Sequence, residues 1–164
     1  MIRLEPMDDA GFREFLERIV PARAERWVRR GLWTADRGLA TSRQEYASLF
    51  SQGRSTPGHY FANVVESTRG KIVGEAWYHA REAGGKVQFW IQWIRIWPEH
   101  RRRGYATDVL RLLEATARGM GAESLRLSVW ADNPGALALY RKVGFEVARM
   151  DLVKPVAPAG EPSA

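Results

Sequence analysis

The sequence contains no cysteine and only three histidines among its 164 residues. Without cysteine, the chain has no disulfide bonds, no thiolate metal ligands and no cysteine nucleophile. The histidines His59, His79 and His100 lie far apart and lack the i, i+4 spacing with which a helix binds zinc. We therefore expect no metal site.

Long apolar runs are missing as well. No run approaches the ~20 residues that span a bilayer, and the first six residues lack the charged-then-apolar layout of a signal peptide. We expect a cytoplasmic protein without a membrane partner.

A hydrophobic content of 45% and a charged content of 27% are typical of a globular domain, and the length favours one domain with a sizeable core. We assign that domain to residues 1–154 and a flexible tail to residues 155–164.

Basic residues exceed acidic ones, which gives a net charge of +6, but only four of the basic residues are lysines. The arginines are scattered, whereas a nucleic-acid-binding surface gathers its charge in a stripe with interleaved aromatic residues. The one dense cluster, residues 101–103, suits a small anionic ligand better. We expect no nucleic-acid partner, although the charge alone keeps a nucleic-acid-binding protein as an alternative.

Helical spacing dominates the first fifty residues. Asp8 or Asp9 is placed to cap a first helix. Pro21 predicts a kink or a restart, with a second helical piece over residues 23–30. A third helix, over residues 40–51, places three large residues on one face: Tyr46, Leu49 and Phe50. Trp27 and Trp33 either anchor the helices against a sheet or line a cleft for an acceptor substrate.

Alternating patterns predict a short N-terminal strand over residues 2–5 and an antiparallel meander over residues 59–66, 72–80 and 86–97. In this meander Glu75 interrupts an apolar strand. We expect its carboxylate to face water, the alternative being a carboxylate held for use. His79 is expected to face solvent or to complete a hydrogen bond at a strand end.

The stretch from Phe89 to Trp97 is apolar on both faces, which is typical of a central strand covered on both sides. It is followed by a helix over residues 106–117 and by another alternating segment over residues 123–130. This order indicates a β-α-β unit with a parallel strand pair. The predicted fold class is α/β (α+β): a mixed, mostly antiparallel sheet with helices on both faces.

The junction between this strand and helix, residues 100–107, reads HRRRGYAT. The first N–H groups of a helix have no internal partner, and the helix dipole favours an anion beside them. Gly104 and Ala106 keep the backbone bare, so that an anion can approach closely. The phosphate-loop pattern and a full G-x-G-x-x-G are absent. The junction therefore predicts a different kind of phosphate-binding turn.

Two motifs resemble those of the GNAT superfamily of acyl-CoA N-acyltransferases. The spacing Arg101-x-x-Gly104-x-Ala106 resembles its R/Q-x-x-G-x-G/A signature. The stretch from Asn133 to Phe145, NPGALALYRKVGF, resembles N-x-x-A-x-x-L-Y-x-x-x-G-F. The second match is the more specific one, and both occur in the family's order.

The resemblance implies an N-acetyltransferase that uses acetyl-CoA as co-substrate and acts on a primary amine, in a fold of the GNAT type. Tyr140 would be the catalytic acid that protonates the departing sulfur. The backbone near Ile94 would bind the pantetheine arm, the junction would bind the pyrophosphate, and Asn133 would contact the cofactor. The implied cofactor-binding residues are Ile94, Arg95, Ile96, Arg101, Arg102, Arg103, Gly104, Tyr105, Ala106, Thr107 and Asn133.

The sequence departs from the family at the general base. Gln92, Arg95 and Ser128 stand where many members carry an acidic residue. Either Glu75, Asp132 or a water chain serves instead, or the amine arrives neutral. A longer-chain acyl donor and a non-catalytic acyl-CoA-binding module remain alternatives. The acceptor, a small molecule or a peptide amine, is not identified, and a homodimer, common in the family, stays open.

Overall fold

The structure, a computed structural model, describes residues 1–154. The predicted tail, residues 155–164, lies outside the described residues. Contacts divide the chain into two compact units, with the boundary between Val129 and Trp130. The elements, in chain order, are β1 (Ile2–Pro6), α1 (Asp9–Arg29), α2 (Gly38–Leu49), η1 (Gly53–Ser55), β2 (His59–Glu66), β3 (Lys71–Ala83), β4 (Lys86–Ile96), η2 (Pro98–His100), α3 (Tyr105–Gly119), β5 (Ala122–Leu127) and α4 (Pro134–Lys142).

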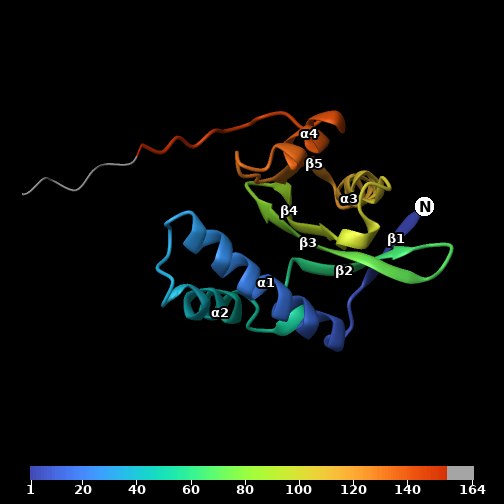
Figure 1. The fold of residues 1–164 in the computed structure, drawn as a ribbon. Coiled ribbons are helices and arrows are strands. Elements are labelled where there is room, and N and C mark those ends of the chain that lie inside the picture. Colours follow the sequence, from blue (N-terminus) through green and yellow to red (C-terminus); the bar gives the residue numbers. More distant parts are fainter. Residues whose placement is uncertain (155–164) are drawn as a thin grey trace, which may run out of the picture. The chain divides into compact units, whose positions relative to one another are not determined.

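The first unit is built on a five-stranded sheet in the order β1-β2-β3-β4-β5. The pairs from β1 to β4 are antiparallel, and β4 pairs with β5 in parallel across α3. In Figure 1, α1 and α2 cover one face of the sheet and α3 covers the other. This confirms the predicted mixed, mostly antiparallel sheet with a β-α-β unit.

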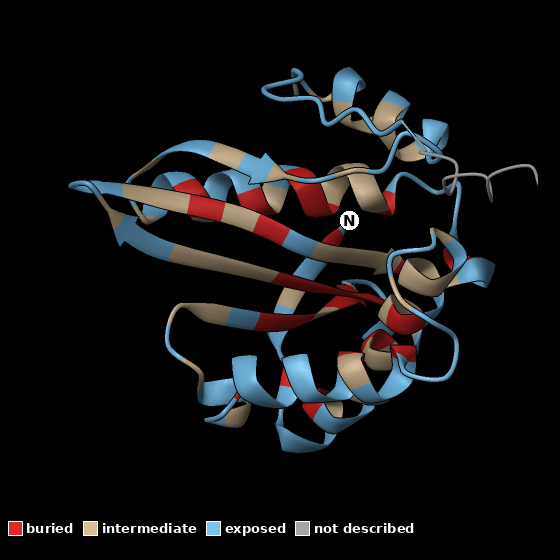
Figure 2. Ribbon diagram, turned by 90° about the vertical axis from the view of Figure 1, so that its left-hand side faces the viewer, coloured by how far each residue is buried: buried red, intermediate tan, exposed pale blue. Residues whose placement is uncertain are grey.

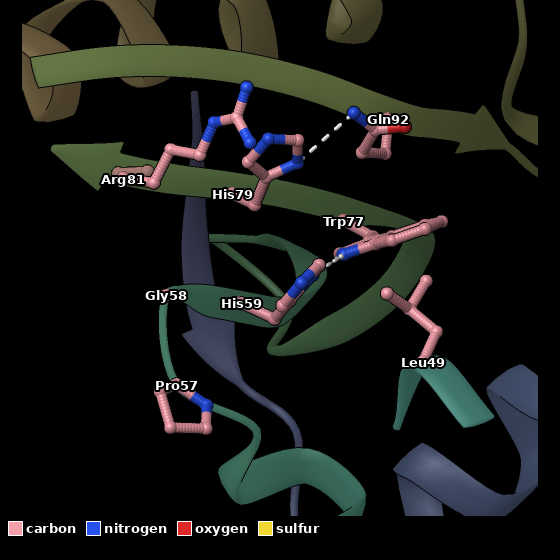
Figure 3. Close-up of a pocket in the computed structure, with 9 residues that line it drawn as sticks. Leu49, Pro57, Gly58, His59, Trp77, His79, Arg81 and Gln92 are labelled. Atoms are coloured by element: carbon pink, nitrogen blue, oxygen red, sulfur yellow. Dashed lines mark hydrogen bonds between the residues drawn. The ribbon is translucent and has the colours of Figure 1, made fainter. Parts of the chain in front are cut away.

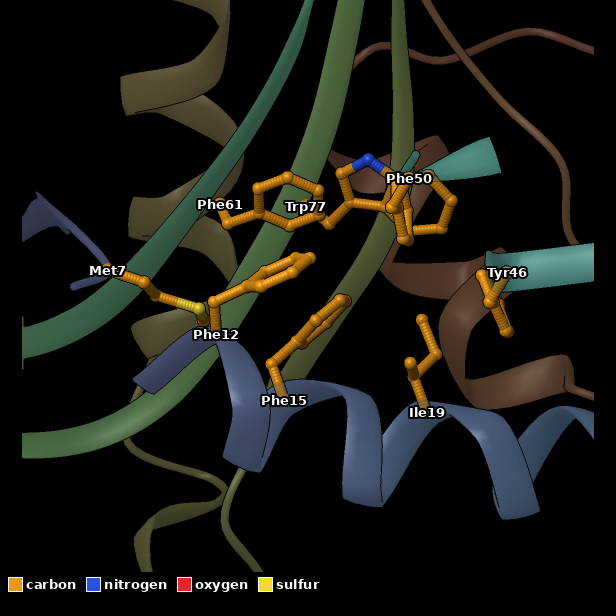
Figure 4. Packing of buried hydrophobic residues seen from close by; sticks show 8 residues of the cluster. All are labelled: Met7, Phe12, Phe15, Ile19, Tyr46, Phe50, Phe61 and Trp77. Atoms are coloured by element: carbon orange, nitrogen blue, oxygen red, sulfur yellow. The ribbon is translucent and has the colours of Figure 1, made fainter. Parts of the chain in front are cut away.

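Aromatic side chains fill the space between the helix pair and the sheet. Residues of α1, α2 and the segments next to them meet residues of β2 and β3 in one cluster (Figure 4): Met7, Phe12, Phe15, Ile19, Tyr46, Phe50, Phe61 and Trp77. Several rings meet edge to face, such as Phe12 and Phe61 with centroids 4.7 Å apart, an arrangement that adds to the stabilisation from burial. On the other face, α3 buries four apolar residues along one side of the helix: Val109, Leu110, Leu113 and Ala117. Figure 2 shows buried residues along the middle of the strands and on the sheet-facing sides of the helices.

The predicted restart at Pro21 is wrong, because α1 runs without interruption through the proline. Asp8 caps the helix by accepting a hydrogen bond from the N–H of Gly11. Burial of Ile19 and Ala24 on either side of Pro21 holds the segment against the fold. The buried Ser42 of α2 also donates to the carbonyl of Val20 (2.8 Å). Tertiary contacts therefore outweigh the local preference of proline to end a helix.

The rings of Trp27 and Trp33 contact each other at a tilt of 31°, with centroids 5.0 Å apart. The guanidinium of Arg23 lies over both rings. The two tryptophans thus join the end of α1 to the segment that leads into α2. None of the helices in the described part of the chain is both long and apolar enough to cross a membrane.

The second unit contains one helix among its described residues, α4. The side chain of Asn133 caps it by accepting from the N–H of Ala136 (3.2 Å), and Pro134 takes the first helical position. Asparagine at the cap and proline at the first helical position are both favoured at the start of a helix. The ring of Tyr140 lies 5.7 Å from that of Phe145.

Candidate active site

The junction between β4 and α3 exposes a series of backbone N–H groups. Gly104 precedes α3 with φ +83°, in the left-handed region that favours glycine, and nothing lies within 4 Å of where its Cβ would be. Across residues 1–154, the N–H groups of residues 102–107 find no hydrogen-bond acceptor. These free donors at the start of a 15-residue helix fit the phosphate groups of an anionic ligand.

The three arginines of the junction have different surroundings. Arg101 Nε donates to the carbonyl of Ile96 (3.1 Å) and so ties the turn to the end of β4. Arg103 reaches back to the carbonyl of Glu99 (3.5 Å). Arg102 has φ +62°, a conformation that costs energy for a residue with a Cβ and is often found at functional sites. All three side chains are exposed.

Two buried residues on the inner side of the junction were missed by the sequence reasoning or given another role. The Tyr105 hydroxyl donates to Glu66 at the end of β2 (2.5 Å). This hydrogen bond lowers the pKa of Glu66 and raises the pKa of Tyr105. His100 is buried, and neither ring nitrogen has a hydrogen-bond partner in the part of the chain that the structure describes. Tyr105 thus points its side chain inward and leaves its N–H to a ligand.

The second half of β4 has one free edge within the first unit. Pairing with β5 ends at Ile91, opposite Leu127, whereas pairing with β3 continues to Ile96. The N–H of Trp97 donates to Val73 on the β3 side (2.9 Å). Because the backbone groups of an antiparallel strand alternate in direction, those of Ile94 and Ile96 point to the free edge and those of Arg95 point to β3. The carbonyl of Ile96 is taken by Arg101.

A β-bulge lies where β4 leaves β5. Trp77 pairs with Trp93 and Tyr78 pairs with Ile91, so Gln92 is the additional residue. Bulges of this kind re-aim a side chain and are frequent beside active sites. The Gln92 amide nitrogen lies 3.1 Å from Nδ1 of His79.

A pocket of about 320 Å³ opens next to this bulge (Figure 3). In it His59 and His79 are cross-strand partners, with ring centroids 5.3 Å apart. Trp77 Nε1 donates to Nδ1 of His59 (3.0 Å). Burial lowers the pKa of His59; burial, then His59 and Arg81, lower the pKa of His79. The expectation that His79 faces solvent or completes a hydrogen bond at a strand end is wrong, because its ring is half-buried inside β3 and contacts the bulged Gln92.

The expectation that Glu75 faces water is wrong. Its side chain is fully buried under α1. Oε2 accepts from Nε and Nη2 of Arg18 (3.0 and 2.9 Å), and Oε1 accepts from the Trp93 indole (3.0 Å). The guanidinium of Arg18 also lies over the ring of Trp97. Both oxygens of Glu75 are therefore engaged by side chains of the fold.

Leu49 was predicted to share an apolar face with Tyr46 and Phe50, but it is 42% exposed. It lines the pocket instead of the aromatic cluster.

In the second unit, Tyr140 is half-buried, and burial raises the pKa of its hydroxyl. The oxygen of the Asn133 side chain is used as the helix cap, which leaves its amide N–H groups for other partners. Within residues 1–154, no three His, Asp or Glu side chains gather in a way that could hold a metal ion.

Comparison with known proteins shows which family has this arrangement. The sequence model of the acetyltransferase (GNAT) family matches residues 22–145. The chain belongs to the GNAT family. It is 32% identical over 145 residues to the uncharacterized N-acetyltransferase YycN of Bacillus subtilis, covering 88% of this chain and 92% of that one. It is 30% identical over 151 residues to YdgE of the same organism, another uncharacterized N-acetyltransferase, covering 92% and 96%.

The crystal structure of Bacillus subtilis YycN superposes with a TM-score of 0.88 at 30% identity, covering 96% of this chain and all of that one. A solved structure from Pyrococcus furiosus, at 21% identity and a TM-score of 0.66, shares the fold over 95% of this chain and all of that one. This GNAT protein is accordingly an acyltransferase enzyme, which sets aside the alternative of a non-catalytic binding module.

Proposed function

We propose that this enzyme transfers the acetyl group of acetyl-CoA to a primary amine, by direct attack of the amine in a ternary complex. The observation that carries the proposal is the open junction after β4, where the N–H groups of residues 102–107 lie free at the start of α3. These groups would bind the pyrophosphate. The free edge of Ile94 and Ile96 would bind the pantetheine arm, and the amide of Asn133 would contact the cofactor.

In the proposed reaction the acyl carbon forms a bond to the amine nitrogen and breaks its bond to sulfur. Free N–H groups on the edge of β4 would stabilise the oxyanion that develops on the carbonyl oxygen. Tyr140 would give its phenolic proton to the departing sulfur, and the raised pKa of its hydroxyl keeps that proton in place at neutral pH. The nitrogen loses one proton as the amide forms, which balances the proton that sulfur gains.

Positioning of the two substrates would supply much of the rate enhancement. Holding the amine against the thioester can lower the activation free energy by ~7–11 kcal/mol in favourable cases. Glu75 is not the base in this proposal, since Arg18 and Trp93 occupy its oxygens. The proton of the ammonium form therefore leaves to Asp132, through a water chain, or before the amine binds. We place the reaction in the cytoplasm, with no nucleic-acid partner, and a homodimer stays a prediction.

The proposal is tested by thiol release from acetyl-CoA in the presence of a panel of primary amines, with butyryl-CoA as a second donor. We expect amine-dependent release and a preference for the acetyl donor. In a matched binding assay, Gly104→Val should weaken CoA binding by at least about tenfold, because a branched side chain would cover the N–H groups. Gly119→Ala, at the other end of α3, should bind CoA normally. Normal CoA binding by Gly104→Val would contradict the role of the junction.

A further inference from the structure

The pocket beside the bulge has a lining that suits one chemical class of molecule. Trp77, His79 and Arg81 are alternate residues of β3 and share the sheet face that α1 and α2 cover. His59 of β2 and Gln92 of β4 complete the polar part of the lining, and the rest is Leu49, Pro57, Gly58 and Ala80. Figure 3 shows these side chains around the opening, with the His59–Trp77 and His79–Gln92 hydrogen bonds drawn.

The hydrogen bonds fix which ring nitrogen of each histidine carries the proton. An indole N–H and an amide nitrogen can only donate. Because they contact Nδ1 of His59 and of His79, both Nδ1 atoms act as acceptors and both neutral rings carry hydrogen on Nε2. The lowered pKa values of both histidines agree with neutral rings at pH 7. The two imidazoles therefore offer N–H donors at their remaining nitrogens.

The charge of the pocket also favours an anionic ligand. Among the nine residues that line it, Arg81 is the only one that carries a full charge, and none is Asp or Glu. The guanidinium makes one long contact, 3.5 Å from the Gln88 side-chain oxygen, and is otherwise exposed. A guanidinium and two imidazole N–H groups are suited to a carboxylate. A polyamine would find no anionic partner in this lining.

We propose that this pocket binds the acyl acceptor, and that the acceptor is a small amine that also carries a carboxylate, as an amino acid does. This inference rests on the proposed N-acetyltransferase function. The carboxylate is held at the Arg81 side of the pocket. The amine is held toward β4, where the Gln92 side-chain oxygen accepts no hydrogen bond from the described residues and can accept one from the amine.

The position of the pocket allows transfer. Gln92 lines the pocket and is the bulged residue, and Ile94, where the free edge of β4 begins, lies two residues further. Two residues of a strand span about 7 Å. A small amine whose carboxylate lies near Arg81 can therefore extend its nitrogen toward the edge at which the thioester would bind.

A binding measurement tests the pocket without turnover. Quenching of tryptophan fluorescence, to which Trp77 contributes, reports binding of 3-phenylpropionate, and 3-phenylpropanamide serves as the uncharged counterpart. The wild type should bind the acid at least about tenfold more tightly than the amide, as expected for charge-assisted hydrogen bonds. Arg81→Gln and His79→Phe should lose most of that preference. Arg43→Gln removes an exposed arginine of α2 outside the pocket and should keep it.

A turnover measurement separates this inference from the proposed function. Thiol release from acetyl-CoA is compared for phenylalanine and phenethylamine, which differ by the carboxylate. We expect kcat/KM at least about tenfold higher for phenylalanine in the wild type and in Arg43→Gln, and a loss of that ratio in Arg81→Gln. Equal use of both amines, unaltered by Arg81→Gln, overturns the inference and leaves the acetyltransferase proposal standing. Absence of release with every amine overturns the proposed function, and the binding measurement then decides the pocket's ligand class alone.

Discussion

At the scale of single residues, Tyr140 is the side chain to which the proposed chemistry assigns a proton. Replacing it by phenylalanine removes the hydroxyl and keeps the ring that contacts Phe145. We expect Tyr140→Phe to lower kcat by about a hundredfold or more, the usual contribution of a general acid, while the Kd for CoA stays the same. Thiol-release kinetics and calorimetric CoA titration measure the two quantities. Tyr60→Phe, an exposed tyrosine of β2, is the control.

The dependence of kcat on pH tests the assignment of Tyr140 as the acid. The active form is the protonated phenol, and burial raises the pKa of Tyr140 above its ordinary value of 10.0. The acid therefore stays available up to alkaline pH, and on the alkaline side kcat should decline only above pH 10. A tenfold decline of kcat as the pH rises from 7 to 9, or a Tyr140→Phe enzyme with the wild-type rate, would remove Tyr140 from the mechanism.

Glu75 shows how a single buried charge contributes to stability. Its two carboxylate oxygens accept hydrogen bonds from the Arg18 guanidinium and from the Trp93 indole. In Glu75→Gln the amide NH₂ must face one of these donors, which leaves a buried polar group without an acceptor. We expect the free energy of unfolding to fall by about 2 kcal/mol or more, measured by urea denaturation.

The matched control for Glu75 is Glu14→Gln. Glu14 contacts the same Arg18 from an exposed position (3.4 Å), so its removal should alter the unfolding free energy by less than about 1 kcal/mol. Equal losses in the two variants would mean that burial of the carboxylate does not matter.

At the scale of elements, the contact between β3 and β4 depends on a glycine. A Cβ on Gly74 would lie 2.3 Å from the carbonyl oxygen of Arg95 and 3.1 Å from the Cα of Ile96. Both are backbone atoms of β4, so Gly74→Ala must push apart the strands at the end that leads into the proposed CoA-binding junction. We expect a loss of about 2 kcal/mol or more in unfolding free energy, together with weaker CoA binding.

Gly119→Ala is again the informative control, because the space around this residue of α3 is open. Alanine inside a helix should leave the stability unaltered or raise it by up to about 1 kcal/mol. A Gly74→Ala protein as stable as the wild type, with normal CoA affinity, would show that β4 can move without affecting the junction.

The elements also show what the sequence could predict. The strand-turn-strand order, the caps at Asp8 and Asn133 and the β-α-β unit follow from local patterns, and the structure has them. The continuity of α1 through Pro21 does not follow, because it depends on contacts with α2 that no local pattern records. Burial of Glu75 is hidden for the same reason: its partner Arg18 lies 57 residues earlier in the chain.

Of the candidate site, too, one part could be predicted from the sequence and another part could not. The strand-to-helix junction at residues 100–107 was predictable because its glycine, its arginines and its helix are contiguous in sequence, and its role in binding phosphate stays a proposal. The pocket was not, because α2, β2, β3 and β4 each contribute residues to it, and pairing of His59 with His79 depends on strand register. The bulge at Gln92 was likewise invisible, since one extra residue in a strand leaves no mark in an apolar run.

At the scale of the whole molecule, the net charge of +6 has a role in the proposed function that needs no nucleic acid. A positively charged protein attracts a multiply charged anion such as CoA over long distances, and salt screens this attraction. We expect the association rate constant for CoA to fall by about tenfold between ~10 mM and ~200 mM salt, with a smaller effect on dissociation. Stopped-flow fluorescence at several salt concentrations measures both rates.

Pantetheine supplies the matched control, because it retains the arm that would lie along β4 and lacks the phosphates. Its association should show little dependence on salt, since no charge is steered. The difference between the two salt slopes isolates the electrostatic contribution of the phosphates from contacts with Ile94 and Ile96. Equal slopes for CoA and pantetheine would mean that the free N–H groups and arginines after β4 do not receive the phosphates, and the excess charge would then need another partner.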